Sequence, residues 1–145
     1  MEVRFYDHVN DNKITYAVII ARANGKWVFC KHKDRDTWEF PGGHREANEI
    51  IEDTARRELY EETGAIEFSI VPVCPFGVFG DVFNASIESE DHYGMLYVSE
   101  INGFEKNLHY EMEEILLLDN VTDHWTYPIV QPLLLKEARR RGFIK

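Results

Sequence analysis

The sequence is poor in cysteine, and the two cysteines that it has lie far apart. Among 145 residues, only Cys30 and Cys74 carry thiols, and both stand among apolar neighbours. Two widely spaced thiols provide neither a disulfide framework nor the paired spacing of a zinc site. We therefore expect both to be reduced core residues and the protein to be cytoplasmic.

Long hydrophobic runs are absent as well. No apolar stretch approaches the ~20 residues that a helix needs to cross a bilayer, and the opening MEVRFYDHVNDNK lacks the apolar centre of a signal peptide. No repeat, low-complexity tract or Pro/Gly/Ser-rich linker interrupts the chain. With 44% hydrophobic and 29% charged residues, the composition is globular. We expect a single domain over residues 1–145 with no membrane partner.

Positive charge is scarce. Lys and Arg number 16 against 26 Asp and Glu, which gives a formal net charge of −10. Binding to a nucleic acid duplex needs a basic face that displaces counterions, so we expect no duplex partner. An acidic protein can still bind a small polyanion where metal ions lie between the two.

Apolar patterning predicts a series of short strands joined by turns. The Asn24-Gly25 pair predicts a tight hairpin turn, because both residues tolerate positive φ. Pro41-Gly42-Gly43 also has the composition of a turn. We expect strands over Val3–Tyr6, Ile14–Ala21, Trp27–Lys31, Trp38–Phe40, Glu67–Val73, Gly94–Val98 and Ile115–Leu118.

Two helices complete the predicted elements. Helix formers fill Ile50–Thr63, and Gly64 follows as a C-terminal stop. A second helix is expected over about Pro128–Arg141, with Pro in its first turn and basic residues in its last. The fold class that follows is α/β or α+β, a mixed β-sheet covered by helices.

Three glutamates gather near the end of the first expected helix. Glu58, Glu61 and Glu62 lie three or four residues apart, and such residues share a helix face. Like charges at this spacing destabilise a helix by roughly 0.2–0.5 kcal/mol per pair, and the helix dipole disfavours them in the last turn. A divalent cation removes both penalties, and oxygen ligands favour Mg²⁺ or Mn²⁺ over zinc. Taken alone, however, a Glu-rich helix is usually a solvated face.

The residues around this acidic face follow a longer pattern. Gly43 is followed after five residues by Glu49, after seven more by Arg57-Glu58, and then by Glu61-Glu62 and Gly64. Chance gives these seven identities at a frequency on the order of 10⁻⁸ per starting position. The segment resembles the nudix box, G-x5-E-x7-R-E-U-x-E-E-x-G-U, in which U is a bulky aliphatic residue. Only the last position departs from the pattern, since Ala65 stands there.

The resemblance covers the box at residues 43–65 and implies the nudix α/β/α sandwich for the whole chain. It also implies Mg²⁺ or Mn²⁺ as cofactor. By position, Glu58 and Glu62 would be metal ligands, with Glu61 a ligand or shared ligand. The backbone carbonyl of Gly43 would reach a metal as well. Two further residues would hold these ligands in position: Arg57 would pair with the carboxylates, and Glu49 would clamp the loop to the helix.

The implied reaction is hydrolysis of a nucleoside diphosphate linked to another moiety, by a water that the metal activates. The resemblance does not decide which residue is the general base. In the family it lies either in the box helix, where Glu58 and Glu61 are candidates, or on a downstream loop. Tyr110–Glu114 is such a loop, and Glu111 is our first choice within it, although a solvated acidic loop is an equal alternative.

Binding the phosphates needs cations, and four are candidates. Lys31, Lys33 and Arg35 follow the hairpin, and Arg45 lies within the box loop. Any one of them alone is more often a solubilising surface charge. Thr122–Tyr127, just before the last helix, is a candidate for contacts to the base, with a plain surface role for His124 as an equal alternative.

The family resemblance leaves the substrate open. The chain looks most like the MutT-type nucleoside triphosphate pyrophosphatases, which include bacterial enzymes that remove oxidised guanine nucleotides such as 8-oxo-dGTP. A pyrophosphatase for ADP-ribose or a nucleotide sugar is the alternative among enzymes. A non-catalytic nucleotide-binding module is the alternative of another class, although such modules typically lose box glutamates that this sequence retains. The protein would be a monomer or a homodimer.

Overall fold

The computed structural model describes residues 2–80, 92–105 and 112–145. A seven-stranded sheet has the order β1-β5-β6-β2-β3-β7, and β4 pairs with β2 beside this path. The strands are β1 (Glu2–Phe5), β2 (Ile14–Ala23), β3 (Lys26–His32), β4 (Gly42–His44), β5 (Ala65–Phe79), β6 (Tyr93–Phe104) and β7 (Met112–Leu118). The helices are η1 (Asp11–Lys13, a 3₁₀ turn), α1 (Ile51–Thr63) and α2 (Val130–Arg140).

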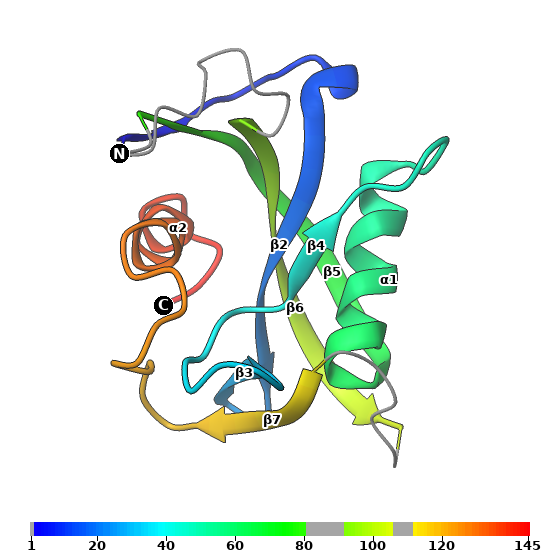
Figure 1. Cartoon of the computed structure of the whole chain (residues 1–145), viewed down its shortest axis with the longest axis vertical. Helices are drawn as coiled ribbons and strands as arrows, with labels where there is room; N and C mark the ends of the chain where they lie inside the picture. The colour runs from blue at the N-terminus through cyan, green and yellow to red at the C-terminus, as the bar shows by residue number, and fades with distance from the viewer. Residues whose placement is uncertain (1, 81–91, 106–111) are drawn as a thin grey trace.

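The helices α1 and α2 cover opposite faces of the sheet, so the molecule is an α/β/α sandwich (Figure 1). Residues of β2 alternate between the two cores, which is why this strand is apolar on both faces. Ala17 and Ile19 pack in the core that holds Leu59 of α1, while Val18 and Ile20 pack in the core that holds α2. The predicted mixed α/β fold class is therefore confirmed.

Strand β2 has two different partners on one edge, and this division creates the site. Its first half pairs with β4, with Ala17 opposite Gly43. Its second half pairs with β3, with Ala21 opposite Val28. The chain between β3 and β4 must therefore leave the sheet, and α1 follows directly after β4 and its loop (Figure 1).

The expected turn at Pro41-Gly42-Gly43 is wrong, because the two glycines form strand β4. A Cβ on Gly42 would lie 2.3 Å from the Ala17 carbonyl oxygen, so a side chain would prevent this approach of β4 to β2. The expected strand at Trp38–Phe40 is reduced to single bridges, Cys30 with Glu39 and Trp38 with Trp125. Glycine here permits close strand pairing rather than a reversal of the chain.

The other expected elements are present with shifted ends. The hairpin turn is confirmed by φ of 52° at Asn24 and 75° at Gly25, and α1 ends at Gly64 with φ of 77°. Helix α2 begins two residues after Pro128, and β5 continues past Val73 with a bulge between Pro72 and Cys74.

Both cysteines are buried free thiols, as expected. Within the part of the chain that the structure describes, neither helix is long and apolar enough to span a membrane.

Candidate active site

The centre of the site is the contact between β4 and the last turns of α1. Gly43 faces Glu58 so closely that a Cβ there would lie 2.2 Å from the Glu58 carboxyl carbon and 2.5 Å from each of its oxygens. Only a glycine leaves room for this carboxylate against the strand backbone. Carboxylate oxygens are thereby brought beside the backbone of the first residue of the box.

Glu62 lies one turn further along α1 and is buried, with 7% of its surface exposed. Its Oε1 accepts a hydrogen bond of 2.8 Å from the backbone N–H of Gly42, which ties α1 to β4 a second time. Burial raises the pKa of the Glu58 carboxyl, and it raises that of Glu62 well above its ordinary range. Glu62 is buried and Glu58 is half-buried beside it, and the charge of Glu58 adds to the rise in the Glu62 pKa, so a metal ion between them would relieve this repulsion.

Arg57 organises the acidic residues around it. Its Nε and Nη2 donate to the two oxygens of Glu49 at 2.8 and 3.0 Å. Its Nη1 donates to Glu58 at 2.7 Å and to Glu61 at 3.2 Å. A planar guanidinium with five donors can make all of these contacts at once, and no other side chain can. Arg57 thus fixes the orientation of Glu58 from behind.

Glu49 connects the box loop to the helix. Besides Arg57, its Oε1 accepts hydrogen bonds from the Thr54 hydroxyl at 2.6 Å and from the Glu46 backbone N–H at 3.1 Å. The Arg57 hydrogen bonds lower the pKa of Glu49 to about 2. The structure thus brings Glu49 and Arg57 together in the loop-to-helix arrangement that the sequence predicts.

The donor set that the structure describes suits a hard divalent cation. It consists of the Glu58 and Glu62 carboxylates, which lie beside the backbone of Gly43 and Gly42. The sequence predicts the Gly43 carbonyl as a third oxygen donor, and Gly43 pairs with Ala17 of β2. Glu61 belongs to the same helix face, but its carboxylate is directed to Arg57. Within residues 2–80, 92–105 and 112–145, no three His, Cys, Asp or Glu side chains form a compact metal-binding group. Two carboxylates plus a carbonyl still fit Mg²⁺, which usually completes its shell with waters and substrate phosphate oxygens.

The four cations proposed for phosphate binding have different surroundings. Arg45 donates to the Asp11 carboxylate and carbonyl at 2.8 Å each, to the Ile14 carbonyl at 3.1 Å and to the Glu49 carbonyl at 2.6 Å. These contacts hold the box loop against η1, so the donors of Arg45 are engaged within the protein.

The remaining three cations belong to the chain that follows β3. Lys31 Nζ donates to the Arg35 carbonyl at 3.0 Å, and Arg35 Nη1 donates to the Tyr127 hydroxyl at 3.5 Å. Lys33 is exposed. Tyr127 ends the segment expected to contact the base, so Arg35 joins the two predicted substrate regions.

Glu111 lies outside the described residues, as do Tyr110 and the rest of 106–111. Glu111 directly precedes Met112, the first residue of β7. The backbone of Met112 pairs with His32 at the end of β3, and β7 lies next to α1 (Figure 1). Strand β7, which follows Glu111 along the chain, therefore lies beside the helix that carries Glu58 and Glu62.

Glu39 is a candidate functional residue that the sequence analysis missed. Only 8% of its surface is exposed, and among the described residues its Oε1 accepts no hydrogen bond. Arg35 Nη1 lies 3.7 Å from this oxygen, and burial raises the pKa of Glu39. The sequence does contain a hint of this role, because Glu39 stands between two large aromatic residues, Trp38 and Phe40, and an acid flanked in this way is expected to be buried. An unsatisfied buried carboxyl oxygen is a candidate acceptor for a substrate N–H or O–H.

Comparisons with known proteins agree with this geometry. A family model described as NUDIX domain matches residues 11–131. A Bacillus subtilis protein, named provisionally as the 8-oxo-dGTP diphosphatase YtkD, is 29% identical over 152 aligned positions that cover 100% of this chain and 93% of that protein. A MutT-like protein of Streptomyces ambofaciens is 36% identical over 53 residues, 37% of this chain and 34% of that protein.

Solved structures show the same fold. The Bacillus subtilis pyrophosphohydrolase BsRppH superposes with a TM-score of 0.78 and 25% identity, covering 99% of this chain and 93% of that one. A Caenorhabditis elegans Ap4A hydrolase superposes with a TM-score of 0.64 and 15% identity, over 89% and 99% of the two chains. The second likeness concerns the fold alone.

Proposed function

The chain belongs to the NUDIX family of hydrolases, and we propose that it hydrolyses a nucleoside triphosphate to the monophosphate and pyrophosphate, with an oxidised guanine nucleotide such as 8-oxo-dGTP as the first candidate. Enzymes of this family act on small nucleotide substrates and generally use a divalent metal. The observation that carries the proposal is the contact of Glu58 with Gly43, held from behind by Arg57 and Glu49.

The names of two relatives support the choice of substrate class. YtkD, similar over 93% of its length, is named provisionally as an 8-oxo-dGTP diphosphatase. BsRppH, similar over 99% of this chain, is named as a pyrophosphohydrolase. Both names describe hydrolysis of a phosphoanhydride bond, which is the reaction class that we propose.

We propose Mg²⁺ or Mn²⁺ as cofactor, held by Glu58, Glu62 and the Gly43 carbonyl. When bound, such an ion neutralises phosphate charge and lowers the pKa of a water. The protein then has two tasks. Arg57 keeps Glu58 in position through the hydrogen bond of 2.7 Å, and a carboxylate must accept the proton of the attacking water.

For the proton acceptor we propose Glu111 first and Glu58 second. A carboxylate bound to metal is a poor base, because the cation lowers its proton affinity. A carboxylate that binds no metal ion would escape that effect, and β7, which follows Glu111 along the chain, lies next to α1. For substrate contacts we propose Lys31, Lys33 and Arg35, together with Glu39 as an acceptor. Arg45 is better explained as a residue that holds the box loop.

A substrate panel tests the function. Nucleoside triphosphates, including 8-oxo-dGTP, are assayed with Mg²⁺ alongside ADP-ribose and a nucleotide sugar, and the products are resolved as monophosphate plus pyrophosphate or as diphosphate plus phosphate. We expect monophosphate plus pyrophosphate from a triphosphate, no turnover in excess EDTA, and recovery with Mg²⁺ or Mn²⁺. Full turnover in EDTA would contradict the proposal. Faster hydrolysis of ADP-ribose than of any triphosphate would identify the protein as an ADP-ribose pyrophosphatase instead.

The general base is tested separately. Glu111→Gln should lower kcat by roughly 10²–10⁴, the usual contribution of a general base, with little change in KM. If Glu111→Gln keeps normal turnover and Glu58→Gln abolishes it, the base lies in the box helix.

For the location we propose the cytoplasm, a choice that the two buried free thiols support.

A further inference from the structure

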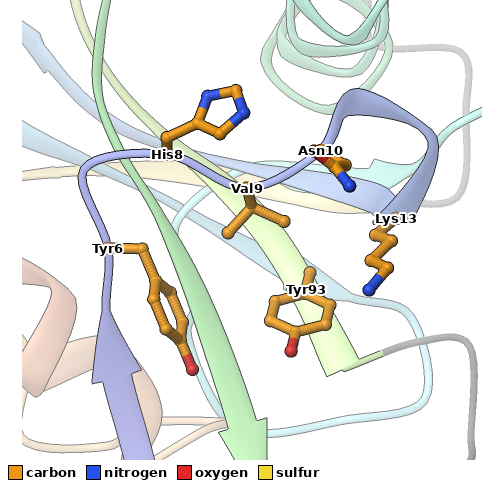
Figure 2. Close-up of a pocket in the computed structure, with 6 residues that line it drawn as sticks. All are labelled: Tyr6, His8, Val9, Asn10, Lys13 and Tyr93. Carbon is orange, nitrogen blue, oxygen red and sulfur yellow. The ribbon is translucent and has the colours of Figure 1, made fainter.

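A second concave site lies at the opposite end of β2 from the hairpin turn, outside the nudix box. It is an open hollow of about 260 Å³ and is lined by Tyr6, His8, Val9, Asn10, Lys13 and Tyr93. Figure 2 shows that the Tyr6 and Tyr93 rings and the Lys13 side chain lie on one side of the segment 6–13, whereas the His8 ring points to the other side. None of these residues belongs to the box or to the proposed substrate contacts.

The walls of this pocket suit a flat aromatic ring. Tyr6 and Tyr93 meet edge to face, with ring centroids 5.9 Å apart and planes at 62°. Val9 is half-buried and packs against the core under α1, so its position is fixed. The backbone N–H of Tyr6 donates to the Pro75 carbonyl at 3.0 Å, which anchors the wall to β5. Aromatic side chains in such a setting bind nucleobases by stacking, with tolerance for the base.

The rim of the pocket adds a positive charge. Lys13 is exposed and forms no ion pair with the residues that the structure describes, in a chain with a formal net charge of −10. The neighbouring acid, Asp11, is taken by Arg45 at 2.8 Å. An exposed lysine for which the described residues supply no acidic partner fits an anionic group of a ligand, and the Asn10 amide, which lines the same pocket, supplies both a donor and an acceptor.

We propose that this pocket binds a nucleoside 5′-phosphate unit, with the base against Tyr6 and Tyr93 and the phosphate at Lys13. The hollow has a volume of about 260 Å³, enough for a base, and Lys13 lines it together with the two tyrosines. The pocket is linked to the box loop, because Arg45 bonds both Asp11 of η1 and the Glu49 carbonyl. The unit bound here is distinct from the one that is hydrolysed, so the inference does not rest on the proposed function.

Binding without turnover tests this inference. GMP is titrated into the full chain in EDTA, and amide chemical shifts are followed by NMR at Tyr6, Asn10, Lys13 and Tyr93 and, separately, within 43–65. We expect saturable shifts in the first group, weaker binding of guanosine than of GMP, and loss of affinity by about tenfold or more in Lys13→Glu, since a charge-assisted contact is removed.

Controls separate this site from simple charge effects and from misfolding. Lys136→Glu makes the same charge change at an exposed position of α2 and should leave the affinity unchanged. Tyr6→Leu keeps an apolar wall and should weaken the binding of GMP and guanosine alike, with a normal spectrum elsewhere. Shifts confined to residues 43–65, no shift at millimolar GMP, or equal weakening by Lys136→Glu would each overturn the inference. Hydrolytic activity, or its absence, bears on none of these results.

Discussion

Gly43 determines where the carboxylate of Glu58 can lie. Any Cβ at this position would meet that carboxylate at 2.2–2.5 Å. Gly43→Ala should therefore displace Glu58 and lower turnover by about 10²-fold, as expected for a misplaced catalytic group, while the melting temperature changes little because the displaced side chain is flexible. Steady-state kinetics and thermal melting check both parts. Gly103→Ala is the control, since its Cβ would meet the exposed Glu67 side chain at 3.3 Å, a tight contact that a shift of a few tenths of an ångström relieves, far less than Gly43 requires. Normal kcat in Gly43→Ala would show that Glu58 needs no such contact.

Arg57 contacts three carboxylates through different nitrogens of its guanidinium group. Lysine keeps the charge but cannot contact Glu49 through two nitrogens and Glu58 and Glu61 through a third. Arg57→Lys should weaken Mg²⁺ activation by about 10–100-fold, the usual cost of losing a partner that orients a ligand. A Mg²⁺ titration of kcat measures it. Arg56, the preceding residue, pairs with Glu52 and lies over the Phe68 ring, contacts that lysine can also make, so Arg56→Lys should behave as the parent protein. Equal behaviour of the two variants would contradict the assigned role.

At the scale of elements, the end of α2 depends on a buried carboxylate. Glu137 accepts from Arg140 at 2.6 and 2.8 Å and from Arg141 at 2.8 Å, and these hydrogen bonds, Arg140 first, lower its pKa from 4.5 to about 2. A lowered acid pKa gives stability that is complete above pH 4.5 and is lost as pH falls towards 2. Glu137→Gln should therefore lower the melting temperature at pH 7 but match the parent near pH 2. Glu100→Gln, on an exposed part of β6, should differ little at either pH. A constant difference across the pH range would contradict the linkage.

The elements also show which features were readable from sequence. Helix α1 was predicted to within one residue, because its apolar spacing and the left-handed Gly64 are local signals. Strand β4 was not, since Gly42-Gly43 has the local composition of a turn and its pairing with β2 is decided by distant residues. The role of Arg45 could not be predicted either. Its acidic partner Asp11 lies 34 positions away in the sequence, so the sequence alone does not show that the charge of Arg45 is already paired. The box identifies the family and its acids, but the unsatisfied Glu39 emerges only after folding.

At the scale of the whole molecule, the acidic site should make stability depend on metal. Glu62 is 7% exposed, and burial raises its pKa, so at neutral pH its ionised form opposes folding unless a cation is present. Mg²⁺ at 100 times its Kd should stabilise the parent protein by about 2.7 kcal/mol. Glu62→Gln keeps an oxygen that can accept from the Gly42 N–H, and it removes the charge. Melting without metal at pH 7 should therefore rise in Glu62→Gln, whereas the further rise caused by Mg²⁺ should shrink.

Thermal melting in EDTA and in saturating Mg²⁺ distinguishes this explanation from a structural role of Glu62. Glu67→Gln, on an exposed stretch of β5, is the matched control and should leave both melting temperatures near those of the parent. If Glu62→Gln melts lower than the parent in EDTA and still gains the full Mg²⁺ increment, the carboxylate stabilises the fold through its neighbours and the metal is held elsewhere. If it melts higher in EDTA and gains little from Mg²⁺, the same charge that weakens the empty protein is the one that binds the ion. The acidic face of α1 would then be retained for function at the expense of stability, as trade-offs at active sites commonly are.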